Sequence, residues 1–253
     1  APEVKGAGGA GDCGSSVPRC FPKRGEGEPA ASTQWWVLLV QLLPMCVVLP
    51  VRRIMTWLCY AYLWLRLMEY GLDRFPALLA SLCFTKALAS VVFPLIAIAL
   101  KWLVIGKYTA GRYPLWGSYY CRWWVMDKTF LILGRGVFRS SSGMLTLYYR
   151  LMGAKIGRRC QIAKTAEIGE YDLLIIEDDT VMDACWARPF CLDQGEMVLE
   201  KIHIGRHCSI STKSSVAPGA IVPPGTCIGP LSSSYEMHDS VRSNRDTCRP
   251  AFR

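Results

Sequence analysis

The sequence predicts membrane α-helices followed by an all-β left-handed parallel β-helix of about four coils. Three observations lead to this prediction. Long apolar runs fill residues 35–105, branched apolar residues recur at every sixth position after residue 156, and a segment rich in Tyr, Trp and Arg lies between the two. A spacing of six matches neither the helical period of 3.6 residues nor the two-residue alternation of an ordinary strand.

The six-residue spacing predicts the fold of the C-terminal half. Each unit begins with a branched apolar residue, continues with a small or turn-prone residue, and has a small residue four places on. The units begin at Ile156, Ile162 and Ile168, and again at Ile204, Ile210, Val216, Val222 and Ile228. Hexapeptide repeats of this kind are typical of parallel β-helices. We therefore expect a hexapeptide-repeat domain over residues 144–234.

The repeat changes register in its middle. Ile176 and Met182 come two residues later than the early units predict, and the later units return to the first register. A loop over residues 188–197 is expected to absorb the difference. Loops that project from such folds often build acceptor sites, although ordinary corner roles remain open. The candidate acceptor residues are Arg188, Phe190 and Asp193.

The apolar runs cover residues 35–51, 54–72 and 76–105. A bilayer core of about 30 Å requires about 20 mostly apolar residues per helix. Residues 35–105 therefore predict two or three transmembrane helices, and the alternative is a set of buried helices in a large soluble core. Six Lys and Arg residues lie between 107 and 139, which places the repeat domain on the cytoplasmic side of the membrane.

The remaining composition limits the partners. The net charge of +9 favours attraction to an anionic membrane surface, and we expect no nucleic-acid partner. Residues 106–143 are expected to lie along the membrane interface. Residues 1–34 read as a disordered tail or linker and residues 235–253 as a polar tail. Because the chain begins with Ala1, we expect a fragment or a processed product.

Cysteine spacing argues against a metal site. The chain has 12 Cys residues, but no C-x-x-C pair and no Cys/His cluster with zinc spacing. We therefore expect no metal, and reduced cysteines that serve as small apolar side chains.

Three blocks carry a resemblance to a known family. They are K-W-L-V-I-G-K-Y followed by G-R-Y-P-L-W-G-S-Y-Y-x-R-W-W at 101–124, L-Y-Y-R-L-M-G-A-K-I-G at 147–157, and C-I-G-P-L-S-S-S-Y-E at 227–236. Over about residues 35–250 the chain resembles the membrane-bound C-terminal region of poly-ε-lysine-synthetase-like nonribosomal peptide synthetases, including their fungal-type relatives.

This resemblance implies partners and a cofactor. In that family, adenylation and carrier domains precede transmembrane helices that alternate with hexapeptide-repeat domains. The repeat domains are thought to join the carrier-bound amino acid to the growing chain. The implied cofactor is a phosphopantetheine thioester on an upstream carrier domain, or coenzyme A. The implied partners are the membrane, upstream adenylation and carrier domains, and sister repeat domains packed as in a trimer.

Hexapeptide-repeat acyltransferases generally use a His as general base beside a thioester. In the bacterial relatives that His is expected in the 188–197 loop, but Phe190 occupies its place here. His203 is the remaining candidate base, with an exposed structural residue as the alternative. His207 is expected on the outer surface and His238 in the tail.

A basic cluster near the start of the repeat is the candidate phosphate site. Lys155, Arg158 and Arg159 have the charge to hold a phosphate of coenzyme A or phosphopantetheine, or they form a solvated basic end of the fold.

Three functions remain open from the sequence. The first is part of a peptide-bond-forming synthetase that transfers a carrier-bound aminoacyl or acyl thioester to an amine. The second is a membrane-tethered hexapeptide acyltransferase that uses acyl-coenzyme A. The third is a catalytically silent module that anchors or oligomerises the active parts.

Overall fold

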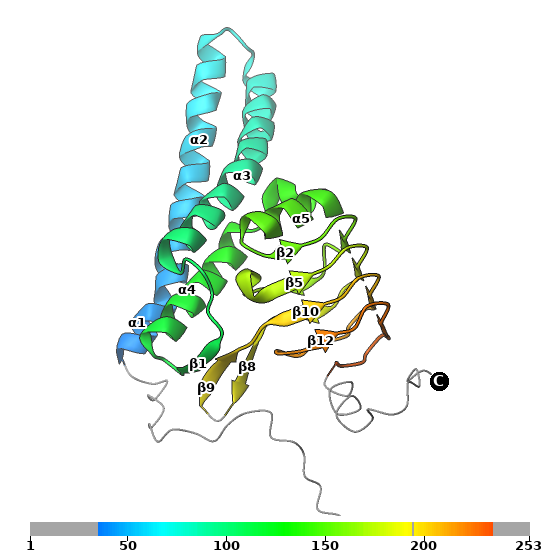
Figure 1. The fold of residues 1–253 in the computed structure, drawn as a ribbon. Helices are drawn as coiled ribbons and strands as arrows, with labels where there is room; N and C mark the ends of the chain where they lie inside the picture. Colours follow the sequence, from blue (N-terminus) through cyan, green and yellow to red (C-terminus); the bar gives the residue numbers. More distant parts are fainter. Residues whose placement is uncertain (1–34, 194, 235–253) are drawn as a thin grey trace, which may run out of the picture.

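A computed structural model describes residues 35–193 and 195–234 of the chain. It consists of a long helical hairpin and a stack of small sheets, with further helices between them (Figure 1). The expectations for the segments 1–34 and 235–253, including His238, lie outside the described residues.

The first two predicted apolar runs form one helix. Helix α1 (Trp35–Leu43) continues through a π-helical turn, Pro44–Val48, into α2 (Leu49–Glu69). A wide turn is physically reasonable here, because Pro44 has no backbone N–H to donate to the preceding turn. Arg52 lies within α2, and its side chain donates a hydrogen bond to the carbonyl oxygen of Ile132.

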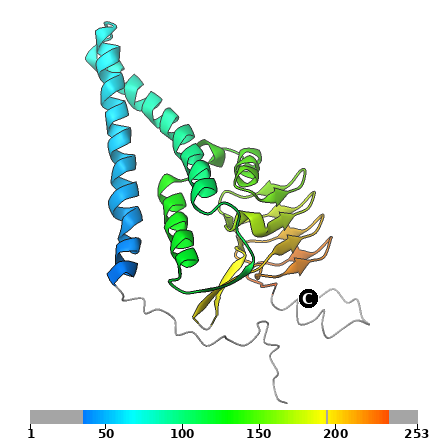
Figure 2. The same ribbon diagram turned by 60° about the vertical axis from the view of Figure 1, so that its left-hand side comes forward.

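Helix α3 (Arg74–Val104) returns antiparallel to α2. The helices Trp35–Glu69 and Arg74–Val104 are long and apolar enough to cross a membrane. The described residues therefore contain two candidate spans rather than three. Figure 2 shows α2 and α3 meeting at their connecting turn and diverging toward the sheets, where α4 (Ser118–Leu133) lies between them.

Helix α4 belongs to the core although it lies in the predicted interfacial segment. Tyr120 and Trp123 on α4 and Tyr108 before it are at most 7% exposed and pack in the main apolar core. The placement of residues 106–143 along the membrane interface stays a prediction. After α4, a 3-10 turn (Gly136–Arg139) packs against α3.

The close approach of this turn to α3 depends on two residues. Pro94 in α3 cannot donate to the carbonyl oxygen of Ser90, which leaves that oxygen free on the helix surface. Gly136 has a φ of +42°, and a Cβ at this position would lie 1.9 Å from the Ser90 oxygen. A side chain here is sterically excluded.

Helix α5 (Ser142–Leu151) lies at the beginning of the predicted β domain. The hydroxyl of Ser141 accepts a hydrogen bond from the backbone N–H of Met144 and caps the helix. The hydroxyl of Ser142 accepts from the backbone N–H of Ile162 at 2.9 Å. Helix α5 thereby covers the first edge of the sheets, which would otherwise expose unpaired strands.

Short strands form three small parallel sheets. The orders are β12-β10-β5-β2, β13-β11-β6-β3 and β4-β7. The strands are β2 (Lys155–Ile156), β3 (Gln161–Ile162), β4 (Glu167–Ile168), β5 (Leu174–Ile176), β6 (Val181–Met182), β7 (Trp186–Ala187), β10 (Ile202–Ile204), β11 (Ser209–Ile210), β12 (Ile221–Val222) and β13 (Cys227–Ile228). Most are two residues long.

The register explains the sequence shift. Ile156 pairs with Ile176, 20 positions later, whereas Ile204 pairs with Val222, 18 positions later. The two extra residues fall where the chain passes through a 3-10 turn at Tyr171–Leu173. The paired branched side chains are buried, since each of Ile176, Ile204 and Val222 is at most 2% exposed.

The predicted all-β left-handed parallel β-helix of about four coils is wrong. The C-terminal half combines helix α5, a 3-10 turn and several small parallel sheets of short strands, an α/β-like arrangement in which no left-handed β-helix is evident among the described residues. The uninterrupted hexapeptide repeat is not supported either. The six-residue spacing predicted which side chains are buried. Burial alone, however, does not specify which strands pair with each other.

The predicted loop at 188–197 is an antiparallel hairpin. Strands β8 (Phe190–Asp193) and β9 (Glu196–Leu199) pair with each other, and β1 (Gly111–Pro114) pairs with β9. Arg112 on β1 holds Asp193 at 3.3 Å and Glu196 at 3.2 Å. The hairpin therefore joins the sheets to the segment that follows α3.

A buried ion pair joins α3 to the sheets. Lys101 has no exposed surface, and its Nζ lies 2.7 Å from Oδ2 of Asp172. The same carboxylate oxygen accepts a hydrogen bond from the backbone N–H of Tyr108 at 3.1 Å. Breaking a buried pair leaves an uncompensated charge, so this contact holds the end of α3 against the sheets.

Candidate functional site

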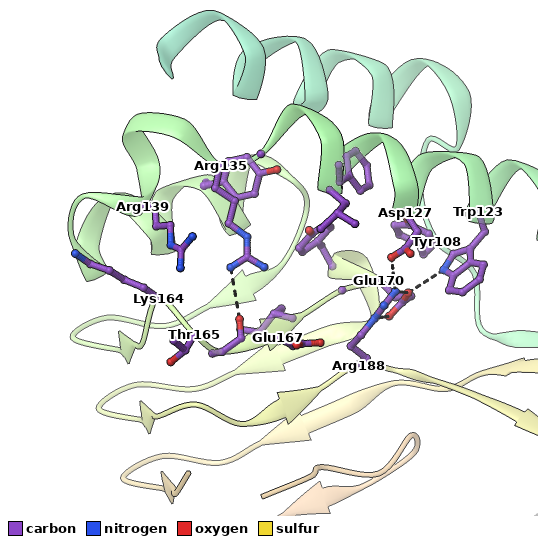
Figure 3. Close-up of a pocket in the computed structure, with 18 residues that line it drawn as sticks. Tyr108, Trp123, Asp127, Arg135, Arg139, Lys164, Thr165, Glu167, Glu170 and Arg188 are labelled. Atoms are coloured by element: carbon purple, nitrogen blue, oxygen red, sulfur yellow. Dashed lines mark hydrogen bonds and ion pairs between the residues drawn. The ribbon is translucent and has the colours of Figure 1, made fainter. Parts of the chain in front are cut away.

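A cleft of about 510 Å³ lies between α4 and strand β4, and Arg188, which follows β7, also lines it. The end of α4 and the 3-10 turn after it form one wall, and residues 164–171 form the other. Figure 3 shows two charged groups at its two ends: Arg135, Arg139 and Lys164 at one, and Asp127, Glu170 and Arg188 at the other.

Glu170 is the most buried charged group in the cleft. Its side chain is 1% exposed, and its backbone has φ +43° and ψ +51°, a left-handed conformation that few non-glycine residues adopt. Nε1 of Trp123 donates to Oε1 of Glu170 at 2.8 Å, and Nη2 of Arg188 donates to the same oxygen at 2.6 Å. Burial raises the pKa of the Glu170 carboxyl, and Arg188 and Trp123 counteract only part of that rise.

Arg188 is the centre of the network. Besides Glu170, its Nη2 donates to Oδ1 of Asp127 at 3.0 Å. The guanidinium lies 4.6 Å from the centroid of the Phe190 ring, a cation–π contact. Burial lowers the pKa of Arg188, but the carboxylates of Glu170 and Asp127 outweigh burial, and the net shift is upward. Arg188 therefore carries a permanent charge.

Gly169 makes room for this arrangement. A Cβ at Gly169 would lie 2.6 Å from Nε of Arg188. The same Nε lies 3.3 Å from Oε2 of Glu170, so the guanidinium could not move away without losing this hydrogen bond. Only a residue without a side chain allows the guanidinium to lie flat against this strand end.

Asp127 is the accessible carboxylate of the inner end. It lies on α4, its side chain is 26% exposed, and Oδ2 accepts from Nζ of Lys128 at 3.0 Å. Inside the cleft, two carboxylates face the single guanidinium of Arg188. Because Lys128 already pairs with Asp127, an incoming ammonium group would compete with Lys128 for this partly exposed carboxylate.

Tyr108 adds a neutral donor to the same cleft. It is 6% exposed, and burial raises the pKa of its hydroxyl well above the ordinary value. The hydroxyl is therefore protonated at neutral pH and can donate a hydrogen bond to a developing oxyanion.

The predicted loop residues divide between two roles. Arg188 lines the cleft, and Phe190 packs with its ring centroid 5.0 Å from that of Trp123 and beneath Arg188. Asp193 lies in the hairpin and binds Arg112 instead. The structure therefore brings Arg188 and Phe190 together and separates them from Asp193.

His203 does not line the cleft. It lies on β10 with a side chain that is 41% exposed, and its Nε2 is 3.0 Å from Oε1 of Glu177. Nε of Arg206 is 3.5 Å from the other oxygen of Glu177. The three side chains form an outer patch, called here the His203 patch. A catalytic role for His203 stays a prediction.

The predicted phosphate-binding residues lie outside the cleft as well. Arg159 pairs with Asp179, and its side chain is 77% exposed. The backbone N–H of Arg158 donates to Oδ1 of Asp178 at 2.6 Å, and Lys155 lies exposed on the edge strand β2. Binding of a phosphate by these residues stays a prediction.

Sequence reasoning missed most of the cleft. Glu170, Asp127, Arg135, Arg139 and Lys164 come from four separate segments, and only the fold brings them together. One signal pointed to Glu170: it directly follows Ile168-Gly169, the last unit before the register shift.

Comparison with known proteins finds similarity to a synthetase. The chain is 26% identical over 210 residues to the delta-poly-L-ornithine synthetase of Acinetobacter baumannii, an alignment that covers 83% of this chain. The chain spans only 16% of that protein's length. No protein-family model matches the chain. No solved structure shows significant similarity to it. What the chain resembles is therefore one part of a much longer synthetase.

Proposed function

We propose that this chain is part of a membrane-bound nonribosomal peptide synthetase-like enzyme, in which it transfers a carrier-bound aminoacyl thioester to an amine. The observation that carries the proposal is the alignment over 83% of the chain with a poly-ornithine synthetase. The two helices long enough to span a membrane support an integral membrane location, and the basic residues after α3 favour a cytoplasmic cleft.

The cleft supplies groups that the reaction requires. An amine attacks the thioester carbonyl only after it has lost a proton, and the carbonyl oxygen becomes negative in the transition state. Asp127 is placed to accept the proton from the ammonium group. The amine nitrogen then bonds to the carbonyl carbon and loses its second proton to solvent water as the carbon–sulfur bond breaks. The proton passes from Asp127 to the departing thiolate.

The other groups of the inner end position Asp127 and the carbonyl. Arg188 fixes Oδ1 of Asp127 and is itself fixed by Glu170. The hydroxyl of Tyr108 is available to the oxyanion. The carrier thioester, the upstream adenylation and carrier domains and packing against sister domains belong to the same proposal.

The test uses the full-length protein in detergent with its carrier charged with a radiolabelled amino acid. Transfer of label to added free amino acid is followed with wild-type protein, with Asp127→Asn and with Arg122→Ala, a control at an exposed basic residue on the same helix. We expect transfer by wild type and the control, and about a hundredfold slower transfer by Asp127→Asn.

Other outcomes favour the alternatives. Transfer from acyl-coenzyme A with no charged carrier would favour the membrane-tethered acyltransferase. Normal transfer by every variant of the cleft and of His203 would favour the catalytically silent module.

A further inference from the structure

The outer end of the cleft carries charge that the reaction at the inner end does not use. Arg135, Arg139 and Lys164 line this end, and Glu167 is the acidic residue among them. Three cations against one carboxylate leave an excess of positive charge. Figure 3 shows the three basic side chains gathered around one opening, separate from the Glu170–Arg188 network.

Two of these cations are not neutralised within the described part of the protein. Arg139 and Lys164 are exposed, and neither forms an ion pair within residues 35–193 and 195–234. Arg135 is different, because it is held in place. Its Nη1 lies 3.5 Å from the carbonyl oxygen of Ala166, and its guanidinium lies 5.5 Å from the centroid of the Tyr149 ring.

From this arrangement we infer that the outer end of the cleft binds a phosphodiester. Arginine guanidinium groups present paired N–H donors that match two oxygens of a phosphate, and lysine adds a point charge. A phosphodiester has one negative charge and two free oxygens, which suits a fixed arginine flanked by two mobile cations. A neutral or cationic ligand would leave this excess charge unbalanced.

The shape of the cleft relates this site to the inner end. The aromatic rings of Phe130, Tyr148 and Tyr171 line the cleft together with both charged groups. A ligand held by its phosphate at the outer end can therefore extend past these rings toward Asp127. In this form the inference rests on the function proposed above, because a phosphopantetheine arm is such a ligand.

The same chemistry has a second source. The exposed Leu131 lines the cleft beside α3 and the membrane hairpin, so a phospholipid headgroup can reach the same cations. Both ligands present a phosphodiester or phosphate ester to Arg135, Arg139 and Lys164. They differ in the group attached beyond the phosphate, and binding experiments distinguish them.

The first arm of the test measures binding directly and requires no activity. Full-length protein, expressed without a phosphopantetheine transferase so that no attached arm competes, is titrated calorimetrically with pantetheine and with phosphopantetheine whose phosphate is methylated to give a phosphodiester. We expect wild type to prefer phosphopantetheine by about tenfold or more, because its phosphate accepts charge-assisted hydrogen bonds that pantetheine cannot form. Arg139→Ala/Lys164→Ala is expected to abolish the preference, and the control Arg122→Ala/Lys201→Ala to retain it.

The second arm tests the lipid. The same proteins are purified from membranes, and retained anionic phospholipid is counted by native mass spectrometry. Lipid that is retained by wild type and by the control but lost from the double variant would assign the site to a headgroup, whatever the transfer assay shows.

Equal binding of phosphopantetheine and pantetheine by wild type, together with equal lipid retention by all variants, would overturn the inference. A failed transfer assay with selective phosphopantetheine binding would instead count against the proposed reaction alone. The two proposals therefore fail separately.

Discussion

The cleft and the His203 patch contain similar residue types in opposite surroundings. In the cleft, Arg188 pairs with Glu170, and their side chains are 15% and 1% exposed, respectively. In the patch, Arg206 pairs with Glu177, and their side chains are 64% and 34% exposed, respectively. Water screens the second pair and is largely excluded from the first. Burial, more than residue identity, therefore decides which of the two groups holds a fixed geometry.

Removing one arginine from each region should have the largest difference in effect. Arg188→Ala leaves Glu170 buried without its cation, and we expect it to cost about 3–5 kcal/mol locally. Arg206→Ala should cost less than about 1 kcal/mol. Hydrogen exchange in the full-length protein measures both, with peptides covering β4, β7 and α4 for the cleft and peptides covering β5 and β10 for the His203 patch. Equal protection in the two variants would remove the distinction between the regions.

The two candidate bases can be compared in the same way. Asp127→Asn keeps the shape of the side chain and removes its basicity, so the rate of transfer should fall by about a hundredfold or more. His203→Gln should change it less than about twofold, because a solvated His–Glu pair lies outside the cleft. Single-turnover kinetics with a charged carrier gives both rates. The opposite result would place catalysis on the sheet, where the sequence predicted it.

Glycines in matching sequence positions allow a finer test. Gly169→Ala should displace Arg188, with a cost of about 1–3 kcal/mol and slower transfer. Gly205→Ala would bring a Cβ to 2.7 Å from the backbone N of Pro224, far from any group of the cleft. Thermal unfolding should detect both substitutions, whereas the transfer assay on the folded protein should detect only the first.

The smallest expected effect concerns one hydroxyl group. Tyr108→Phe retains the buried ring and removes the proposed oxyanion donor, so transfer should slow by about tenfold. The KM for the carrier should not change, because the contact strengthens only in the transition state. A change in KM without a change in kcat would assign Tyr108 to substrate binding instead.

Only the residues of the cleft that lie in one continuous segment could be predicted from the sequence. The loop at 188–197 was located from the register shift, and Arg188 and Phe190 do lie in or against the cleft. Asp127 and Arg135 were indistinguishable in the sequence from the other charged residues after α3. They line the cleft because α4 packs against the sheets, and no local sequence pattern predicts this packing.

Local sequence chemistry specifies which parts of this chain are apolar and which side chains are buried. Apolar runs gave the two helices able to span a membrane, and the six-residue spacing identified Ile162, Ile204 and Val222 as core residues at most 2% exposed. Tertiary packing sets how many helices the runs form, how the short strands group into sheets, and which charges meet. The physical reason is that the tendency to be buried lies in each residue's own chemistry. The partner of a buried charge such as Glu170 lies elsewhere in the chain, and only folding brings the two together.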